Sequence, residues 1–380
     1  MYQKYYKEFL ESHKEKVHMA AHSHHFWPDI SKEGHLKAWE IAKNHSDNKW
    51  EYLLGDLLPD VQEIISKIIN FSRPADISFA SNTHELLVRM ISCFFHKPTI
   101  NILTTTNEFH SLSRQVKRFE ELENYNIEYI DPDQDDFSEN LRNKLEKNEY
   151  DIIFISHIFF NTGKILSKTN IESIIELKKN AQFILDGYHS FCAVPVDISR
   201  YEDDIYYLSG GYKYAQAGEG MCFMTLPSNC NLRPAITGWF ASFETLDSEQ
   251  SEMTAYSKNG MRFWGATLDM TSFLRFSYVW NFFYKNGLDV DKFDQYIKSL
   301  QLQFLNQNNL SKYFTSLNVN EIGHFITAEL SDTEKAKSIH NLLKSKGIIT
   351  DFRGNRLRFG FGPYLSQQDI ETVKVAINSI

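Results

Sequence analysis

Two ionisable side chains, Asp186 and Lys213, each follow a short apolar run and together suggest a reactive site. Asp186 ends the run QFILD, where a buried carboxylate is costly unless it meets a cation or a strong donor. A protonated pyridine nitrogen is such a cation, and the amine of Lys213 can form an imine with an aldehyde. Either residue alone is more simply a capping Asp or a surface Lys. Together they indicate carbanion chemistry on a pyridine-aldehyde cofactor, pyridoxal phosphate (PLP).

A phosphate site is suggested by SNTHELL, where an extended run gives way to a helical one. Asn82 and Thr83 stand at that junction. A helix N-terminus offers free N–H groups and the positive end of the helix dipole, and a Thr hydroxyl adds a donor. A plain helix cap is the simpler alternative for either residue.

The elements that must position these residues alternate from about residue 77 onward. Short β-rich runs such as 101–106, 151–156 and 182–186 are separated by helical stretches. This alternation predicts an α/β fold with a mostly parallel sheet covered on both faces. Ligands bind such sheets at the carboxyl ends of the strands. The residues that follow the predicted strands are Asn82, Thr83, Phe109, His157, Asp186, His189 and Lys213.

The pattern changes after about residue 240, which predicts a second domain. Helical stretches dominate from 267 to 310, and a short α+β segment ends with RLRFGF at 356–361. We therefore expect a large cofactor-binding domain at 30–240. Residues 1–29 and 241–380 form the predicted small domain.

Composition narrows the class of protein. The chain has 380 residues, 42% hydrophobic and 23% charged, with a formal net charge of −9. An acidic chain repels a phosphate backbone, so we expect no nucleic-acid partner. Its four cysteines lack metal-ligand spacing, and no apolar stretch is long enough to span a bilayer. The charged N-terminus has no signal-peptide core. We therefore expect a cytoplasmic protein without a membrane partner.

Two motifs resemble the class V branch of the fold-type I PLP enzymes, which have a three-layer PLP-transferase fold with a smaller α+β C-terminal domain. They are Asp186-x-x-His189-Ser190 and Ser209-x-x-Tyr212-Lys213. Within that branch the likeness is closest to kynureninase. It rests on LDGYHSFCAVPVD at 185–197, YKYAQAGEG at 212–220, the pair Gly238-Trp239, and DFRGNRLRFGFGPY at 351–364.

The resemblance implies roles for the matched positions. Lys213 carries the cofactor as a Schiff base and shuttles protons, Asp186 pairs with the pyridine nitrogen, and Tyr212 is a general acid. The implied cofactor contacts are Asn82, Thr83, Phe109, Asp186, His189, Ser209, Tyr212, Lys213, Trp239 and Thr267. Trp239 and Thr267 reach the phosphate from the partner subunit of a homodimer with shared active sites.

Substrate contacts are expected from three parts of the chain. Arg358 clamps the substrate carboxylate, a task suited to a planar guanidinium. His22 and Ser23 belong to the segment AAHSHHFWPD, which stands where kynureninases carry a substrate loop. His45 could line the same pocket or face an ordinary helix surface. The histidines at 18–25 could also hold a metal, but their spacing fixes no complete ligand set, so we predict none.

The leading functional prediction is a kynureninase-like enzyme that hydrolyses the Cβ–Cγ bond of an amino acid held as an external aldimine. A class V aminotransferase and a β-eliminating lyase are the alternatives on the same frame. A cysteine desulfurase ranks lower, because that reaction needs a late cysteine loop and no Cys follows Cys230. A non-catalytic binding protein on the same fold is the further alternative.

Overall fold

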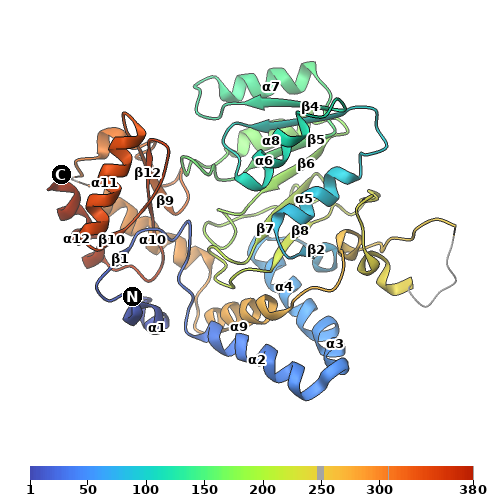
Figure 1. The fold of residues 1–380 in the computed structure, drawn as a ribbon, viewed down its shortest axis with the longest axis horizontal. Helices are drawn as coiled ribbons and strands as arrows, with labels where there is room; N and C mark the ends of the chain where they lie inside the picture. The colour runs from blue at the N-terminus through green and yellow to red at the C-terminus, as the bar shows by residue number, and fades with distance from the viewer. Residues whose placement is uncertain (246–251, 307, 380) are drawn as a thin grey trace.

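A mixed seven-stranded sheet forms the centre of the computed structural model, which describes residues 1–245, 252–306 and 308–379 (Figure 1). The strand order is β2-β8-β7-β6-β5-β3-β4. The strands are β2 (Ile77–Ala80), β3 (Ile100–Thr105), β4 (Tyr125–Ile130), β5 (Ile152–Ser156), β6 (Gln182–Asp186), β7 (Ile205–Gly210) and β8 (Cys222–Thr225). Strands β5 to β8 are apolar and almost wholly buried, as expected for the centre of a covered sheet.

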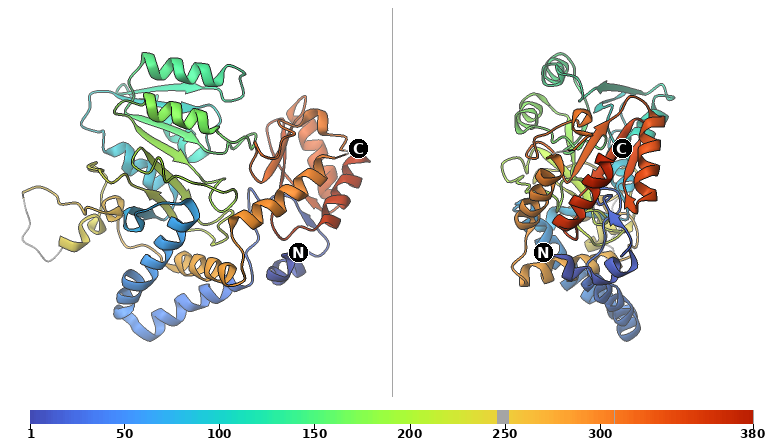
Figure 2. Two further views of the ribbon diagram at one scale, coloured as in Figure 1. Left: turned by 180° about the vertical axis from the view of Figure 1, so that it is seen from behind. Right: turned by 90° about the vertical axis from the view of Figure 1, so that its left-hand side faces the viewer.

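Helices connect the parallel strands and cover the sheet. They are α5 (Thr83–Ser92), α6 (His110–Phe119), α7 (Phe137–Lys147) and α8 (Lys168–Leu177). Figures 1 and 2 show α5 and α6 on one face and α8 on the other. The predicted α/β class with a three-layer, mostly parallel arrangement is confirmed.

Strand β8 is the exception, since it runs antiparallel to both β7 and β2. The chain returns from β7 to β8 through residues 211–221 without a helix, which only an antiparallel pairing allows. That short return carries Tyr212 and Lys213. The geometry of the sheet therefore fixes both residues close to the carboxyl end of β7.

A smaller antiparallel sheet, of order β11-β12-β9, lies in the C-terminal part (Figure 1). Its strands are β9 (Phe325–Glu329), β11 (Asp351–Arg353) and β12 (Arg356–Gly360), with helices α10 (Val290–Leu305), α11 (Thr333–Ser345) and α12 (Gln367–Asn378). The N-terminal chain joins this part: β1 (Val17–His18) pairs in parallel with β10 (Ile348–Ile349), and α1 (Lys7–Ser12) lies nearby.

Helix α2 (Ile30–His45) packs along α9 (Thr271–Lys285), as both figures show. At Gly34 the two backbones approach so closely that a Cβ would lie 2.9 Å from the Cα of Arg275. Two further helices, α3 (Lys49–Tyr52) and α4 (Leu58–Ile69), continue this layer. The α2–α9 contact crosses the predicted boundary between the domains, and the division itself stays a prediction.

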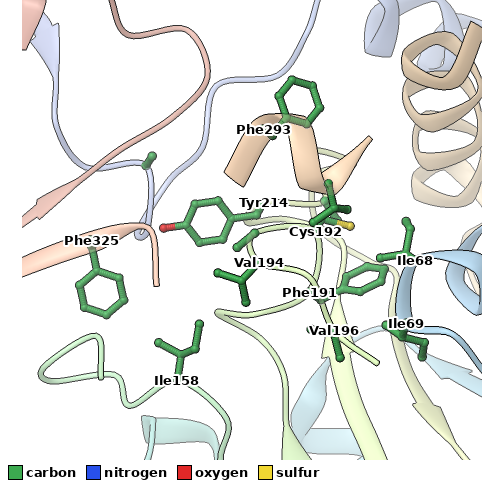
Figure 3. Close-up of a cluster of buried hydrophobic side chains, with 14 of the residues drawn as sticks. Ile68, Ile69, Ile158, Phe191, Cys192, Val194, Val196, Tyr214, Phe293 and Phe325 are labelled. Carbon is green, nitrogen blue, oxygen red and sulfur yellow. The ribbon is translucent and has the colours of Figure 1, made fainter. Parts of the chain in front are cut away.

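One apolar cluster joins the large sheet to the C-terminal part. Figure 3 shows Tyr214 between Phe325 of β9 on one side and Phe191 and Cys192, from the loop after β6, on the other, with Phe293 of α10 above Cys192. Tyr214, the residue after Lys213, lies in the same cluster and is 2% exposed. Burial of these rings fixes the chain on the C-terminal side of Lys213. In the part of the chain that the structure describes, no helix is both long and apolar enough to cross a membrane.

Candidate active site

A cavity of about 220 Å³ opens at the carboxyl ends of the large sheet's strands. It collects side chains from six separate segments, most of them loops that directly follow a strand. Its lining consists of Ser81, Asn82, Thr83, Phe109, Ser111, Ser156, Ile158, Phe160, Asp186, Tyr188, His189, Tyr212, Lys213, Glu219 and Gly220. Seven of the predicted site residues are therefore brought together here: Asn82, Thr83, Phe109, Asp186, His189, Tyr212 and Lys213.

Asp186 is the last residue of β6 and stands opposite Ser156 of β5 in the strand register. Its Oδ1 accepts a hydrogen bond of 2.9 Å from the backbone N–H of Tyr188. Burial raises the pKa of the Asp186 carboxyl to about 6, against the opposing effects of that N–H and of Lys213. A buried carboxylate with spare acceptor capacity is suited to a cationic partner.

Lys213 lines the same cavity and is 4% exposed. Burial lowers the pKa of its amine to about 7, although the charge of Asp186 works in the other direction. Its Nζ lies 2.6 Å from Nε2 of His189, whose pKa burial holds well below the usual value. A substantial fraction of Lys213 is thus the neutral, nucleophilic amine near neutral pH.

Aromatic rings surround the Lys213 amine. The centroids of the Phe109 and Tyr188 rings lie 5.3 Å from Nζ, and that of Tyr212 lies 5.8 Å away. Burial raises the pKa of the Tyr212 phenol, so the phenol is protonated at neutral pH and able to donate. The three rings line the same cavity as Lys213.

The other end of the cavity meets the start of α5. Asn82 caps this helix, and its side chain accepts a hydrogen bond of 3.0 Å from the N–H of Glu85. The hydroxyl of Thr83 lies 3.4 Å from Sγ of Cys222. Ser209 lies beneath the lining, fully buried, where its hydroxyl donates to the carbonyl of Gly187. The first turn of α5 therefore offers an anion-binding end to the cavity.

Three of the predicted residues that do not line this cavity lie away from it within one chain. His45 ends α2 on an exposed helix surface of the single chain, and its place in a substrate pocket stays a prediction. Trp239 is 46% exposed, and Thr267 lies in a separate hollow beside α2 and α3. Their predicted role was to contact the phosphate of the partner subunit, which a single chain does not test.

The N-terminal histidine segment lines a second chamber next to the cavity. Tyr212 and Glu219 border both spaces. Ser23 and His24 lie in the outer chamber, and their side chains are 3.1 Å apart. Apart from these, its wall contains Phe9, His13, His18, Ala20, His25, Phe26, Trp27, Ile349, Thr350, Asp351 and Arg353. No group of His, Cys, Asp and Glu side chains within the described ranges is arranged to hold a metal ion.

Arg358 and His22 lie behind the wall of the cavity. Arg358 is 1% exposed, its guanidinium lies 4.5 Å from the ring centroid of Phe160, and its Nη1 donates to the Phe160 carbonyl at 2.7 Å. Its Nη2 pairs with Asp351. His22 is buried and stacks on Phe325 at 4.8 Å. Both predicted residues are near the cavity, but neither side chain is open to it.

Sequence reasoning missed several residues of the site. Ser156, Phe160, Tyr188 and Glu219 line the cavity, and Glu108 lies buried beside it. Glu108 accepts hydrogen bonds from the hydroxyl of Thr105 and the N–H of Ser156, while burial raises its pKa to about 7. The sequence could have indicated Glu108, because this carboxylate comes shortly after a buried strand, and Asp186 was predicted from its place at the end of such a strand.

The residues of the cavity fit PLP. A phosphate suits the first turn of α5, a protonated pyridine nitrogen suits Asp186, and an aldehyde suits the amine of Lys213. The three groups come from separate strand ends and line one cavity together with aromatic rings. The lining thus offers a complementary group for each reactive end of this cofactor.

A sequence model of the aminotransferase class-V family matches residues 43–373. No curated protein matches the chain by sequence. Among solved structures, a mutant of C-DES with glycine covalently linked to its PLP cofactor is similar. The TM-score is 0.82 at 14% identity, over 99% of this chain and 98% of that chain.

Two further solved structures share the fold. The cystine C-S lyase C-DES with its product cysteine persulfide gives a TM-score of 0.80 at 15% identity, over 95% of this chain and 97% of that chain. The cysteine desulfurase from Thermococcus onnurineus NA1 gives 0.75 at 14% identity, over 97% and 96%. These likenesses confirm the fold-type I architecture. They do not support the expectation that kynureninase is the closest relative.

Proposed function

This chain belongs to the aminotransferase class-V family of PLP-dependent enzymes, and from that premise we propose that it cleaves the side chain of a small amino acid at Cβ. When bound, PLP supplies an electron sink for negative charge that develops on the substrate carbon. Asp186 would hold the ring nitrogen, Lys213 would hold the aldehyde carbon and later move protons, and the first turn of α5 would hold the phosphate.

The observation that carries this proposal is the position of Tyr212. Its phenol borders both the inner cavity, which holds Lys213, and the outer chamber. An amino acid with its α-carbon near Lys213 and its side chain in the outer chamber has its Cβ bond beside Tyr212. Because the pKa of this phenol is raised, it is a protonated general acid at the place where a leaving group departs.

The first candidate reaction is hydrolysis of a Cβ–Cγ bond, as in kynureninase. The rings of the outer chamber support it, since His18 and His13 lie 4.3 and 4.8 Å from the ring of Phe26, centroid to centroid. Flat apolar walls with imidazole nitrogens suit a planar acyl group.

The second candidate is β-elimination with C–S cleavage, which is favoured by the likeness to the cystine C-S lyase. A desulfurase that carries sulfur on its own cysteine is less well supported. Cys93, Cys192 and Cys222 are buried, and among the described residues no cysteine lines either chamber.

Product analysis of the PLP-loaded enzyme tests the proposal. We expect kynurenine-type substrates to release alanine and an aromatic acid if the first candidate holds. Cystine or cysteine would instead give pyruvate, ammonia and a sulfur product if the second holds. Transamination that depends on a keto acid, with no side-chain cleavage of any of these amino acids, would contradict both candidates. Tyr212→Phe should slow cleavage about 100-fold or more while PLP binding persists.

We further propose that the enzyme is a homodimer. Large apolar side chains are exposed on α2 and in the segment after residue 235, most clearly Trp39, which is 73% exposed. Leu36, Ile236, Trp239 and Met253 are exposed as well. Pairing across this surface would cover them and bring Trp239 and Thr267 toward the partner's cavity.

The mass of the protein in solution checks this proposal. Light scattering after gel filtration should give twice the chain mass, and Trp39→Glu should shift the protein toward monomer because it places a charge in the apolar contact. Leu317→Glu is the matched control, since Leu317 is 60% exposed in the C-terminal part. A monomeric wild type at micromolar concentration, or equal effects of the two variants, would contradict the proposed interface.

A further inference from the structure

The ion pair between Asp351 and Arg358 has a feature that a purely structural pair does not need. The two residues face each other across the antiparallel strands β11 and β12. Arg358 is almost fully enclosed, yet its Nε has no hydrogen-bond partner among the residues that the structure describes. Both ring nitrogens of the neighbouring His22 are likewise buried without such a partner. Buried donors in this state are costly unless a ligand satisfies them.

We propose that Asp351 is an internal counter-ion that holds Arg358 until the α-carboxylate of the amino-acid substrate displaces it, so that Asp351 sets the affinity of the site for carboxylates. This inference rests on the proposed function and on the role predicted for Arg358, which is to bind that carboxylate. Its new element is Asp351, which competes with the substrate carboxylate for Arg358 and so lowers the affinity of the site for that carboxylate. Only a ligand with its own carboxylate can replace the interaction that Arg358 loses.

The donor geometry of Arg358 places an entering carboxylate in competition with Asp351. A guanidinium binds a carboxylate with two parallel N–H bonds through an edge that pairs Nη2 with either Nε or Nη1. In Arg358, Nη1 donates to the Phe160 carbonyl and Nη2 pairs with Asp351, so Nε alone is unengaged. A second carboxylate must therefore share Nη2 with Asp351. Two carboxylates at one nitrogen repel each other, and this repulsion favours displacement of Asp351 by the entering carboxylate.

When the Asp351 carboxylate is displaced from Arg358, it can still interact with two neighbouring side chains. Its Oδ1 lies 3.3 Å from Nη1 of Arg353, a side chain that is half exposed in the outer chamber. Its Oδ2 lies 3.7 Å from Nε2 of His22, just beyond hydrogen-bond length. Asp351 is itself part of the outer-chamber wall. A small rotation of this side chain would expose Arg358 and leave the Asp351 carboxylate paired with Arg353.

Binding of propionate to the PLP-loaded enzyme, measured by calorimetry, separates this role from a structural one. Propionate carries the carboxylate and lacks the reacting amine. Asp351→Asn should tighten propionate binding roughly tenfold, because removal of a competing negative charge favours the entering carboxylate. Arg353→Gln should weaken propionate binding several-fold. Without Arg353, Asp351 has lost its alternative cationic partner and pairs more strongly with Arg358. Propanamide should bind no better to either variant than to the wild type.

Asp133→Asn is the matched control. Asp133 forms an ion pair of 2.7 Å with Arg356, which lies on the same strand as Arg358. Asp133 lines neither chamber. This variant should leave propionate affinity unchanged. If Asp351→Asn folds poorly, the exposed change Arg353→Gln still tests the inference, because an unchanged propionate affinity in that variant would overturn it.

Two results would overturn the inference. One is unchanged or weaker propionate binding in a folded Asp351→Asn protein, and the other is unchanged binding in Arg353→Gln. A failure of the underlying function looks different: the PLP-loaded wild type would then cleave the side chain of none of the tested amino acids, which product analysis reports independently of propionate.

Discussion

Lys213→Ala is expected to abolish covalent attachment of PLP and to lower turnover by at least about a thousandfold, because the variant lacks both the attachment amine and the proton carrier. Borohydride treatment of the wild-type enzyme followed by peptide mass analysis should find the cofactor's mass on the peptide that contains Lys213. The visible absorbance of the bound cofactor should change in the variant. Lys179→Ala is the matched control, since Lys179 has a half-exposed side chain far from the cavity lining.

The lowered pKa of the Lys213 amine predicts how the rate of PLP capture depends on pH. Burial places the pKa of Lys213 at about 7, so the neutral amine becomes the major form as the pH rises through 7. The rate at which the apoprotein captures PLP should therefore rise between pH 6 and pH 8 and level off above that range. A lysine with its ordinary pKa would keep gaining rate up to about pH 10. Attachment of PLP to another lysine, or full turnover by Lys213→Ala, would contradict the assignment.

The parts of the site that sequence could predict are those fixed by strand ends. Asp186, Lys213 and the Asn82–Thr83 pair each follow a short apolar run, and parallel strands end at one edge of a sheet. Local pattern was therefore enough to place them in one cavity. Glu108 and Ser156 follow strands in the same way and could have been included by the same reasoning.

The parts that sequence could not predict depend on tertiary contacts. The contacts of Arg358 come from Asp351 on a neighbouring strand and from Phe160, which follows β5 of the large sheet. His22 is buried by Phe325, which is far away in the chain. His45 is exposed in a single chain at the end of helix α2, which a short polar stretch does not reveal. The antiparallel return of β8 was likewise set by the lack of a helix in residues 211–221.

Asp186→Asn is expected to lower turnover about 100- to 1,000-fold while the fold and PLP binding persist. The amide can still accept the N–H of Tyr188, but it has no charge to keep a ring nitrogen protonated. Asp186→Glu should recover part of the loss, because it restores the charge at a shifted position. Asp197→Asn, an exposed carboxylate in the same loop, should have little effect and serves as the control.

Asp186→Asn should also raise the free energy of unfolding of the apoprotein, although it lowers the turnover of the enzyme. Burial raises the pKa of Asp186 from 3.8 to about 6, so ionising it in the folded chain costs about 2–3 kcal/mol at pH 7, at about 1.4 kcal/mol per pKa unit. For an acid with a raised pKa, this cost is absent below pH 4 and fully present above pH 6. Denaturant unfolding should therefore find Asp186→Asn more stable than the wild-type apoprotein at pH 7 and nearly equal to it at pH 4. Equal stability at both pH values would mean that the Asp186 carboxylate is not destabilised in the empty cavity. A gain in stability joined to a loss of turnover would show that the charge is kept for the cofactor, because a bound pyridinium gives this carboxylate the partner that the apoprotein lacks.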